Sequence, residues 1–163
     1  MIANKYIAEG KDIVGLRFGT VNGTSPNTRS DLMINAMVKS ALETGKVNAK
    51  NLHIRRAILG INDLVRAVDT IISKTIPAGQ YNLASFNSSV ETMARTIATK
   101  TNAELVIHEN DKLVYDFELD TEKFRQATDF TFNDTIDNLV SELTSNIDFI
   151  NFDTRNNDRH FKL

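Results

Sequence analysis

The sequence predicts an α/β fold in which at least some strands run parallel. Segments with apolar residues at helical spacing alternate along the chain with short apolar or alternating runs typical of strands. Gly, Pro, Asn or Ser marks most changes from one to the next. No internal repeat or linker divides the chain, so we expect a single domain over residues 1–163.

The first thirty residues predict a short helix, a buried strand and a long loop. The helix covers residues 4–9, and Gly10 ends it. Residues 12–18 form a strand with nearly continuous apolar positions, which is typical of burial on both faces. The polar residues 19–30 form a loop, and loops of this length in compact domains are often functional.

Two helices and several short strands are expected next. Ser30 or Asp31 caps a helix that ends at Gly45. Asn62 stands at the N-cap of the second helix, because apolar residues follow it at helical spacing. The strands expected in this part of the chain cover residues 47–49, 58–61 and 81–84.

The last part of the chain continues the alternation. Ser88 and Glu91 fit the capping-box pattern at the start of a helix. Asp120 caps a short helix, and Asp134 or Thr135 starts the last long one. The strands expected here cover residues 104–108 and 113–119. The tail over residues 151–163 has no clear period and is expected to be docked or frayed.

The composition is that of a soluble globular protein. The net charge of −2 gives no overall attraction to nucleic acid or to a membrane surface. No apolar run approaches the ~20 residues needed to cross a bilayer, and no signal segment opens the chain. Without Cys there is no disulfide or thiolate chemistry, and we expect a cytoplasmic protein. His53, His108 and His160 lack metal-ligand spacing, so no metal site is expected.

The loop over residues 19–30 is a candidate ligand site. It follows a strand directly, and in open α/β sheets the ligand crevice lies beyond the carboxyl ends of the strands. Gly15, Gly19 and Gly23 do not form a dinucleotide fingerprint or a P-loop. The loop therefore either contacts another kind of ligand or only turns the chain.

Three arginines lie in or beside predicted strands. A buried Arg17 would need a carboxylate, a carbonyl or a ligand as its partner. Arg55 and Arg56 should point in opposite directions, because side chains alternate along a strand. Either one faces a crevice, where its planar fork suits a diphosphate, or both lie on the surface.

Three segments resemble the second half of an extended short-chain dehydrogenase/reductase, the family of NAD-dependent nucleotide-sugar epimerases and dehydratases. They are residues 16–23 (LRFGTVNG), 56–63 (RAILGIND) and 80–85 (QYNLAS), in the family's order. The resemblance implies partial Rossmann-like remnant strands followed by the family's small α/β substrate-binding domain. It also implies that Asp63 has a mainly structural role.

The resemblance further implies a nucleotide-sugar site. Arg56 matches an Arg that holds the nucleotide diphosphate in UDP-galactose 4-epimerase and its relatives. At positions 20, 22 and 24 the family usually has Asn, Tyr and Pro, whereas this chain has Thr, Asn and Thr. The substrate-binding residues implied are Arg56, Asn35, Asp31, Arg29, Thr20 and Asn22.

Members of the family use NAD(P), but the resemblance implies that this chain alone binds none, because a glycine-rich turn and a catalytic Tyr are missing. Lys5 resembles a remnant of the catalytic Tyr-x-x-x-Lys helix. Met1 stands where the Tyr would be, and a thioether cannot act as an acid or base. We therefore expect no catalytic residue here.

Three hypotheses remain open from the sequence. The chain is a nucleotide-sugar-binding portion that is inactive alone, or a split-enzyme subunit that needs a separate Rossmann chain. Alternatively, it is a non-catalytic structural or regulatory domain that forms a homo-oligomer. In the last two cases the contact would be the apolar face around Ile13, Val14 and Leu16.

Overall fold

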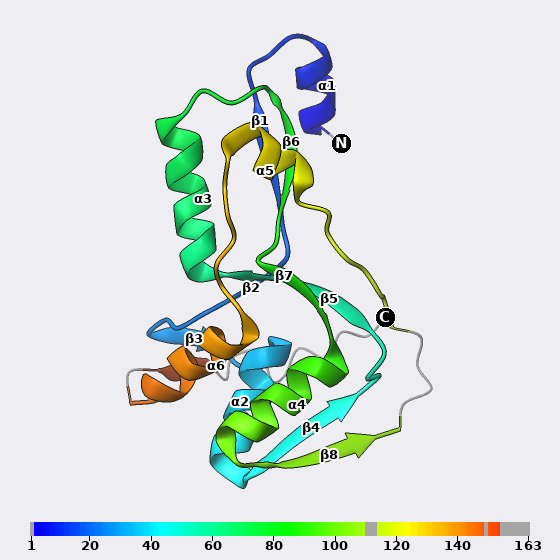
Figure 1. The fold of residues 1–163 in the computed structure, drawn as a ribbon, viewed down its shortest axis with the longest axis vertical. Coiled ribbons are helices and arrows are strands. Elements are labelled where there is room, and N and C mark those ends of the chain that lie inside the picture. Colours follow the sequence, from blue (N-terminus) through cyan, green and yellow to red (C-terminus); the bar gives the residue numbers. More distant parts are fainter. Residues whose placement is uncertain (1, 110–113, 149, 154–163) are drawn as a thin grey trace.

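The computed structural model describes residues 2–109, 114–148 and 150–153, and it confirms a mixed α/β fold with parallel strand pairs (Figure 1). The molecule is elongated, with one group of elements at the top of Figure 1 and another at the bottom. We call these groups the upper and lower lobes. A short three-stranded sheet lies between them.

The upper lobe is built on two parallel strands, β1 (Val14–Phe18) and β6 (Gly79–Leu83). Tyr81 of β6 packs edge-on against Phe124, with ring centroids 6.0 Å apart. The helices of this lobe are α1 (Ile2–Ala8), α3 (Ile61–Ser73) and α5 (Glu122–Thr128). Apolar side chains of α3 and α5 join these aromatic residues in one core.

The sheet between the lobes has the order β2-β5-β7. Its strands are β2 (Thr20–Asn22), β5 (Arg55–Gly60) and β7 (Phe86–Ser89). The central strand β5 runs parallel to β2 and antiparallel to β7. Since β5 leads directly into α3, this sheet connects the loop after β1 to the upper lobe.

The lower lobe is a cluster of helices with two small parallel sheets. Its helices are α2 (Met33–Thr44), α4 (Val90–Thr101) and α6 (Ile136–Ser145). Its strand pairs are β4 (Lys46–Lys50) with β8 (Glu104–His108), and β3 (Asn27–Arg29) with β9 (Asn151–Asp153). The side chains fully buried among the three helices include Ile34, Val38, Met93, Ile97, Leu139 and Leu143.

Several sequence predictions are confirmed closely. The strand over residues 104–108 has its predicted bounds as β8. Gly45 ends α2 in the left-handed conformation, with φ of 69°. Thr135 begins α6 in a capping box, in which its hydroxyl accepts from the N–H of Asn138 and its own N–H donates to the Asn138 side chain.

Other predicted helix starts are wrong, since other residues stand at the N-cap. Asp31 forms an ion pair with Arg29, and Leu32 is the N-cap of α2. Gly60 rather than Asn62 precedes α3. In α4 the cap is Ser89, one residue after the predicted Ser88. The predicted capping-box partner Glu91 forms an ion pair with Arg95 along the helix instead.

Two predicted loop and strand segments also differ. The loop over residues 19–30 contains β2 and β3, because backbone groups there pair with β5 and β9. The predicted strand over residues 113–119 is wrong for its described part, residues 114–119; residue 113 lies outside the described residues. Side chains fix that segment: Asp116 accepts from the backbone of Arg55, and Asn87 forms two hydrogen bonds with the backbone of Leu119.

The predicted burial of β1 on both faces is wrong as well. Val14 and Leu16 are half-buried, whereas Arg17 and Phe18 are exposed, Phe18 to 47%. The Arg17 guanidinium donates to the Gln80 side chain at the surface, so it is not a buried charge. Among the described residues β1 pairs only with β6, and its other edge has no strand beside it.

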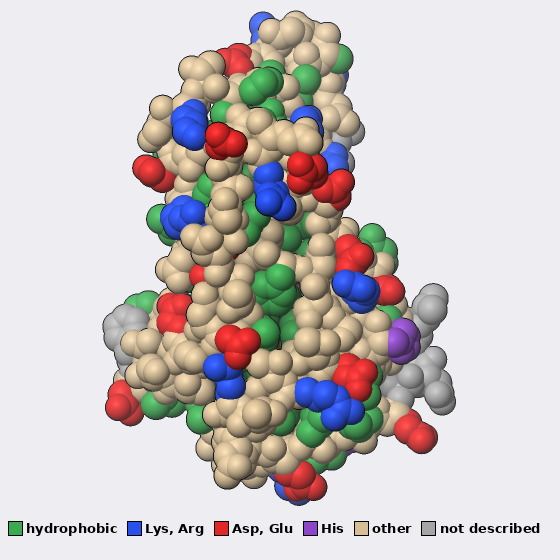
Figure 2. Space-filling view, viewed as in Figure 1, with side chains coloured by type: hydrophobic (Ala, Val, Ile, Leu, Met, Phe, Trp, Pro, Cys, Tyr) green, Lys and Arg blue, Asp and Glu red, His purple; other side chains and the backbone are tan. Residues whose placement is uncertain are grey.

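Within residues 2–109, 114–148 and 150–153, no helix is long and apolar enough to cross a bilayer. On the face drawn in Figure 2, basic and acidic side chains are interspersed, so this face carries no wide area of one charge.

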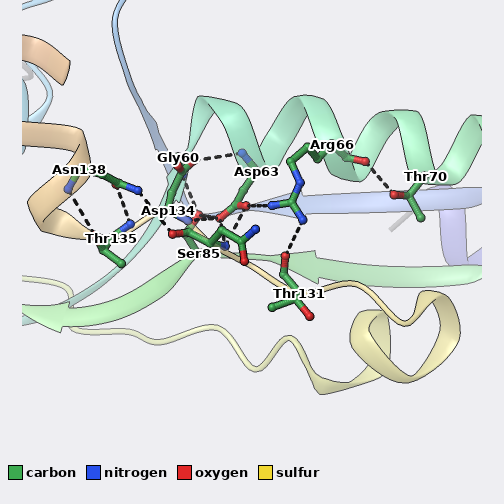
Figure 3. A network of polar contacts seen from close by, with 10 residues as sticks. Gly60, Asp63, Arg66, Thr70, Ser85, Thr131, Asp134, Thr135 and Asn138 are labelled. Atoms are coloured by element: carbon green, nitrogen blue, oxygen red, sulfur yellow. Dashed lines mark hydrogen bonds and ion pairs between the residues drawn. The ribbon is translucent and has the colours of Figure 1, made fainter.

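A network around the buried carboxylate of Asp63 joins the two lobes (Figure 3). Asp63 accepts hydrogen bonds from the Ser85 hydroxyl (2.7 Å), the backbone of Asn133 (3.0 Å) and the backbone of Asp134 (2.8 Å). It also forms an ion pair with Arg66 at 2.7 Å. We call these contacts the Asp63 network.

The network closes on itself at the start of α3. Asp134 accepts from the N–H of Asp63 at 3.0 Å, and Ser85 accepts from the N–H of Gly60 at 2.9 Å. A Cβ atom at Gly60 would overlap the Asp134 carboxylate, so this close approach requires glycine. The structure supports the structural role of Asp63 that the resemblance implied.

The Asp63 network gives a first prediction. Asp63→Asn replaces one acceptor oxygen with an NH₂ group that faces donors on either side, so we expect a loss of about 3 kcal/mol in the free energy of unfolding. Urea denaturation followed by circular dichroism measures it.

The matched control for Asp63→Asn is Asp69→Asn on the exposed side of the same helix, where the expected change is within about 0.5 kcal/mol. Equal midpoints for the two variants would contradict a central role for the network.

Candidate functional site

Two pockets lie on either side of the first turns of α2. The first, which we call the strand-end pocket, has a volume of about 480 Å³. It is lined by Phe18, Gly19, Thr20, Val21, Asn22, Gly23, Thr24, Ser25, Asn27, Thr28, Arg29, Leu32, Asn35 and Ile61. The second, the Arg56 pocket, has a volume of about 340 Å³. It is lined by Met33, Ala36, Met37, Ser40, Asn48, Lys50, Asn51, Ile54, Arg56, Val90 and Val114.

The strand-end pocket forms where the chain leaves β1 and crosses to the middle sheet. The N–H of Gly19 donates to the carbonyl of Leu83 at 2.8 Å, which continues the β1–β6 pairing before the chain enters β2. Gly23 then turns the chain with φ of +151°, in close contact with Ile61 at the start of α3. The pocket therefore lies beyond the carboxyl end of β1, as expected for a ligand crevice in an α/β protein.

Two asparagines form the buried wall of the strand-end pocket. Asn22 and Asn35 are each 2% exposed. The Asn22 amide donates to the carbonyl of Thr20 at 2.8 Å, and the Asn35 amide donates to the carbonyl of Arg29 at 2.9 Å. The Oδ1 atoms of both residues, and the Oγ1 atom of Thr24, are buried without a hydrogen-bond partner among the described residues.

The charge at the rim of this pocket is neutralised. Arg29 donates two hydrogen bonds to the Asp31 carboxylate, at 3.0 and 2.6 Å. The hydrogen bond to Asp31 raises the pKa of the Arg29 guanidinium, and the attraction of the opposite charge adds to it. Arg29 is the only charged residue among the described lining residues, and the Asp31 carboxylate balances its charge. The pocket is therefore close to neutral.

The Arg56 pocket has the opposite electrostatic character. Its floor is apolar and comes from α2 and its neighbours, with Met33, Met37 and Ile54 among the lining residues. Lys50, at the end of β4, and Arg56 are its charged residues, and none of the described lining residues is acidic. The Arg56 guanidinium lies 5.7 Å from the centre of the Phe117 ring and donates to the carbonyl of Arg55.

The two neighbouring arginines do point in different directions. Arg55 is 52% exposed at its side chain and forms an ion pair with Glu118. Arg56 is half-buried and lines the pocket. The alternation expected for a strand is confirmed, and it places one of the two at a crevice.

The structure brings together some of the predicted site residues and separates others. Thr20, Asn22, Arg29 and Asn35 all line the strand-end pocket, and Asp31 reaches it through Arg29. Arg56 lies in the other pocket, across α2. Lys5 is exposed on α1 and lines neither pocket.

Two residues with functional potential were missed. Lys50 adds a second cation to the Arg56 pocket, and the alternating pattern of β4 predicts its exposure but not its neighbours. Thr24 adds a third unpartnered oxygen to the strand-end pocket. Its place among predicted loop residues gave no signal of burial.

Two glycine-containing turns among the described residues lack the features of a dinucleotide-binding turn. A pyrophosphate would need free N–H groups at a helix N-terminus after a glycine-rich turn. At the turn from β5 into α3, the Asp134 carboxylate already accepts from the N–H of Asp63. Gly23 leads into β3 rather than into a helix. Among the described residues there is also no group of three His, Asp or Glu side chains that would hold a metal ion.

No known protein-family model and no curated protein sequence matches the chain. Solved structures of sugar-nucleotide enzymes do share its fold. dTDP-glucose 4,6-dehydratase from Bacillus anthracis, solved with NAD, aligns over 90% of this chain with a TM-score of 0.72 at 18% identity. UDP-glucuronic acid 4-epimerase from Bacillus cereus, solved with UDP-glucuronic acid and NAD, also aligns over 90%, with a TM-score of 0.75 at 15% identity.

ADP-L-glycero-D-manno-heptose-6-epimerase from Helicobacter pylori aligns over 88% of the chain, with a TM-score of 0.72 at 15% identity. The alignments cover 49%, 49% and 48% of these three proteins, so the chain spans about half of their length. At these identities the likeness establishes the fold, which is that of extended short-chain dehydrogenase/reductase epimerases and dehydratases over the aligned region.

The shape of the strand-end pocket gives a second prediction. A Cβ atom at Gly23 would overlap Ile61, and the positive φ disfavours other residues there. We expect Gly23→Ala to lower the free energy of unfolding by about 2–3 kcal/mol, measured by urea denaturation.

Gly45→Ala is the matched control, because Gly45 also has a positive φ but open space around it. It should cost only about 1 kcal/mol. If both variants lose the same stability, the contact between Gly23 and Ile61 does not shape the pocket.

Proposed function

We propose that this chain is the nucleotide-sugar-binding portion of a homologue of the NAD-dependent sugar epimerases and dehydratases, and that it has no turnover by itself. The Arg56 pocket is the observation that carries the proposal. It combines two cations, an apolar floor and no acidic residue among the described lining residues. A nucleoside diphosphate offers the matching chemistry, with a flat base whose faces can pack on apolar side chains and two negative phosphates for the cations.

The two cations differ in what they contribute. Arg56 presents a planar fork that donates two parallel hydrogen bonds to a phosphate, and its position over Phe117 limits how far it moves. Lys50 is exposed at the end of β4 and acts as a point charge. We therefore assign the main phosphate contact to Arg56 and a supporting one to Lys50.

The expected lack of turnover follows from what hydride transfer requires. The epimerase and dehydratase reactions of the resembled family use NAD(P) to take up and return a hydride. At the turn from β5 into α3, the N–H of Asp63 already donates to the Asp134 carboxylate, so it is not free to hold the pyrophosphate of NAD(P). Lys5, the proposed remnant of the catalytic helix, lines neither pocket.

Thermal shift with nucleotide sugars tests the proposal. At a ligand concentration about 100 times Kd, binding adds about 2.7 kcal/mol to the free energy of unfolding, which raises Tm by about 5–10 °C in a domain of this size. We expect this rise with at least one of UDP-glucose, dTDP-glucose and GDP-mannose, and its loss in Arg56→Ala.

Arg55→Ala is the control for Arg56→Ala, because Arg55 precedes it but pairs with Glu118 at the surface. It should leave the shift in Tm intact. The absence of a shift with every nucleotide sugar would contradict binding. Oxidation or epimerisation of any of them by the purified chain with added NAD would contradict the proposed lack of turnover.

The unpaired edge of β1 favours a second candidate, a split-enzyme subunit that docks a separate Rossmann chain. Parallel strands are normally buried, and a sheet of two strands is marginal by itself. Phe18, at the end of β1, is 47% exposed. A partner with a parallel strand next to β1 would cover both the edge and this side chain.

Light scattering tests the second candidate. We expect the chain to co-purify with a partner of different sequence and to give a mass above that of the monomer, whereas a stable monomer without a partner would count against this candidate. A dimer that Phe18→Glu converts to a monomer would instead support self-association through this face. Val65→Glu on α3, at a side chain 61% exposed, is the control and should leave the mass unchanged.

A further inference from the structure

We propose that the outer edge of β8 is a contact between two copies of this chain, which pair antiparallel about Val106 and form a dimer. On its other side β8 pairs with β4, in a sheet of two strands. In Figure 1 it lies at the lower border of the lower lobe. A sheet of two strands is marginal by itself, and pairing of two β8 strands would join two such sheets into a larger one.

The hydrogen bonds at the start of β8 show which of its residues face outward. The N–H of Glu104 donates to the carbonyl of Gly45, next to β4, at 2.8 Å. Backbone groups of successive strand residues point to opposite sides, so Leu105 and Ile107 direct their N–H and C=O groups away from β4. Within the described part of the chain these groups form no hydrogen bond, so the edge is open to another strand.

The side chains along this edge favour pairing. Leu105 and Ile107 lie on one face of β8, because side chains alternate along a strand. Leu105 packs against the core of the lower lobe, whereas Ile107 is 53% exposed. Natural edge strands often carry Lys or Pro, which prevents association, and β8 has neither. A strand from a second copy would cover Ile107 and extend the apolar layer that Leu105 begins.

The sequence of β8 complements itself in the antiparallel direction. With Val106 of both copies on the two-fold axis, Leu105 of each copy lies opposite Ile107 of the other, and Glu104 lies opposite His108. The Leu105–Ile107 pairs exchange hydrogen bonds, because the backbone groups of both residues face outward. A shift of one residue would set outward groups against groups that already point to β4. The backbone and the side chains therefore favour the same register.

The charged ends of β8 add to this complementarity. Glu104 forms an ion pair with Lys46 at 3.7 Å, but its side chain stays 67% exposed and can contact a second copy. The Nε2 atom of His108 lies 2.8 Å from Oδ1 of Asn48, which leaves its Nδ1 atom for the facing carboxylate. His108 also lies opposite Lys50 in the ladder with β4, so a carboxylate from the second copy meets basic groups there.

This contact is separate from the surfaces discussed above. The unpaired edge of β1 belongs to the upper lobe, whereas β8 belongs to the lower lobe (Figure 1). No residue of β8 is among the described lining residues of the strand-end pocket or the Arg56 pocket. The dimer therefore goes beyond the proposed function, and ligand binding and dimer formation can fail independently of each other.

Sedimentation velocity of the purified chain tests the dimer. We expect wild type to change from monomer to dimer between about 1 and 500 µM, as suits a small interface. Ile107→Lys places a charge on the edge and should raise the dissociation constant at least about tenfold. Its Tm in the dilute monomer should stay close to that of wild type, because Ile107 is half exposed there.

Ile72→Lys is the control for Ile107→Lys, because Ile72 is 79% exposed on α3, away from β8. It should leave the dissociation constant unchanged. A chain that stays a monomer throughout this range would overturn the proposal. A dimer that persists in Ile107→Lys, or that Phe18→Glu dissociates, would overturn it as well, because another surface then holds the copies together.

Mixing two charge variants tests the register. Glu104→Lys places Lys opposite His108, and His108→Glu places two carboxylates opposite each other, so each variant alone should dimerise more weakly than wild type. In a mixed dimer the new Lys faces the new Glu, and the unchanged Glu104 faces the unchanged His108. We expect the equimolar mixture to dimerise more tightly than either variant alone. A mixture no tighter than the separate variants would contradict antiparallel pairing about Val106.

Amide hydrogen exchange followed by NMR gives a second measure of the register. Between dilute and concentrated samples, the amides of Leu105 and Ile107 should become protected in proportion to the dimer formed. The amides of Glu104, Val106 and His108 already point to β4 and should change much less. Protection that rises at Val106 rather than at Leu105 and Ile107, or at none of these residues in a dimer, would overturn the proposal.

Discussion

The buried carboxylate of Asp63 holds together the parts of the chain on which both pockets depend. It takes hydrogen bonds from residues far apart in the sequence, Ser85 after β6 and Asn133 and Asp134 before α6. A buried charge is costly unless it is paired and hydrogen-bonded, and here two of the four donor residues, Asn133 and Asp134, donate through backbone N–H groups whose positions the fold sets. The start of α3 is thereby fixed, and with it Ile61, which lines the strand-end pocket.

Helix α2 turns this fixed framework into two sites of different character. Leu32 and Asn35 line the strand-end pocket, whereas Met33, Ala36 and Ser40 line the Arg56 pocket. One short helix therefore gives a neutral wall rich in acceptors on one side and an apolar floor beside two cations on the other. A ligand with a neutral end and an anionic end matches the pair better than it matches either pocket alone.

Sequence reasoning predicted well what local chemistry decides. The left-handed Gly45, the capping box of Thr135 and the strand over residues 104–108 depend on neighbours within a few residues. It was wrong where the predicted side chain or segment has another partner, whether two residues away or far along the chain. Asp31 pairs with Arg29 rather than capping α2, and residues 114–119 are held by side chains of Asn87 and Asp116 rather than by a strand ladder. The same holds for the site. Thr20, Asn22, Arg29 and Asn35 were predicted as site residues and line one pocket, but no local sequence pattern indicated that Arg56 lines a different one.

The exposure of β1 is a further case in which the local sequence pattern did not reveal which strands pair with it. Its residues have the apolar pattern of a strand between two neighbours, yet among the described residues only β6 pairs with it. On the other face of the pair, Arg17 and Gln80 bond to each other, which keeps that side polar. The strand is thus held on one edge by β6 and left available on the other. The pockets depend on β1 only through Phe18 and Gly19 at its end, so Phe18 is the group that a partner at that edge and a ligand at the strand end would share.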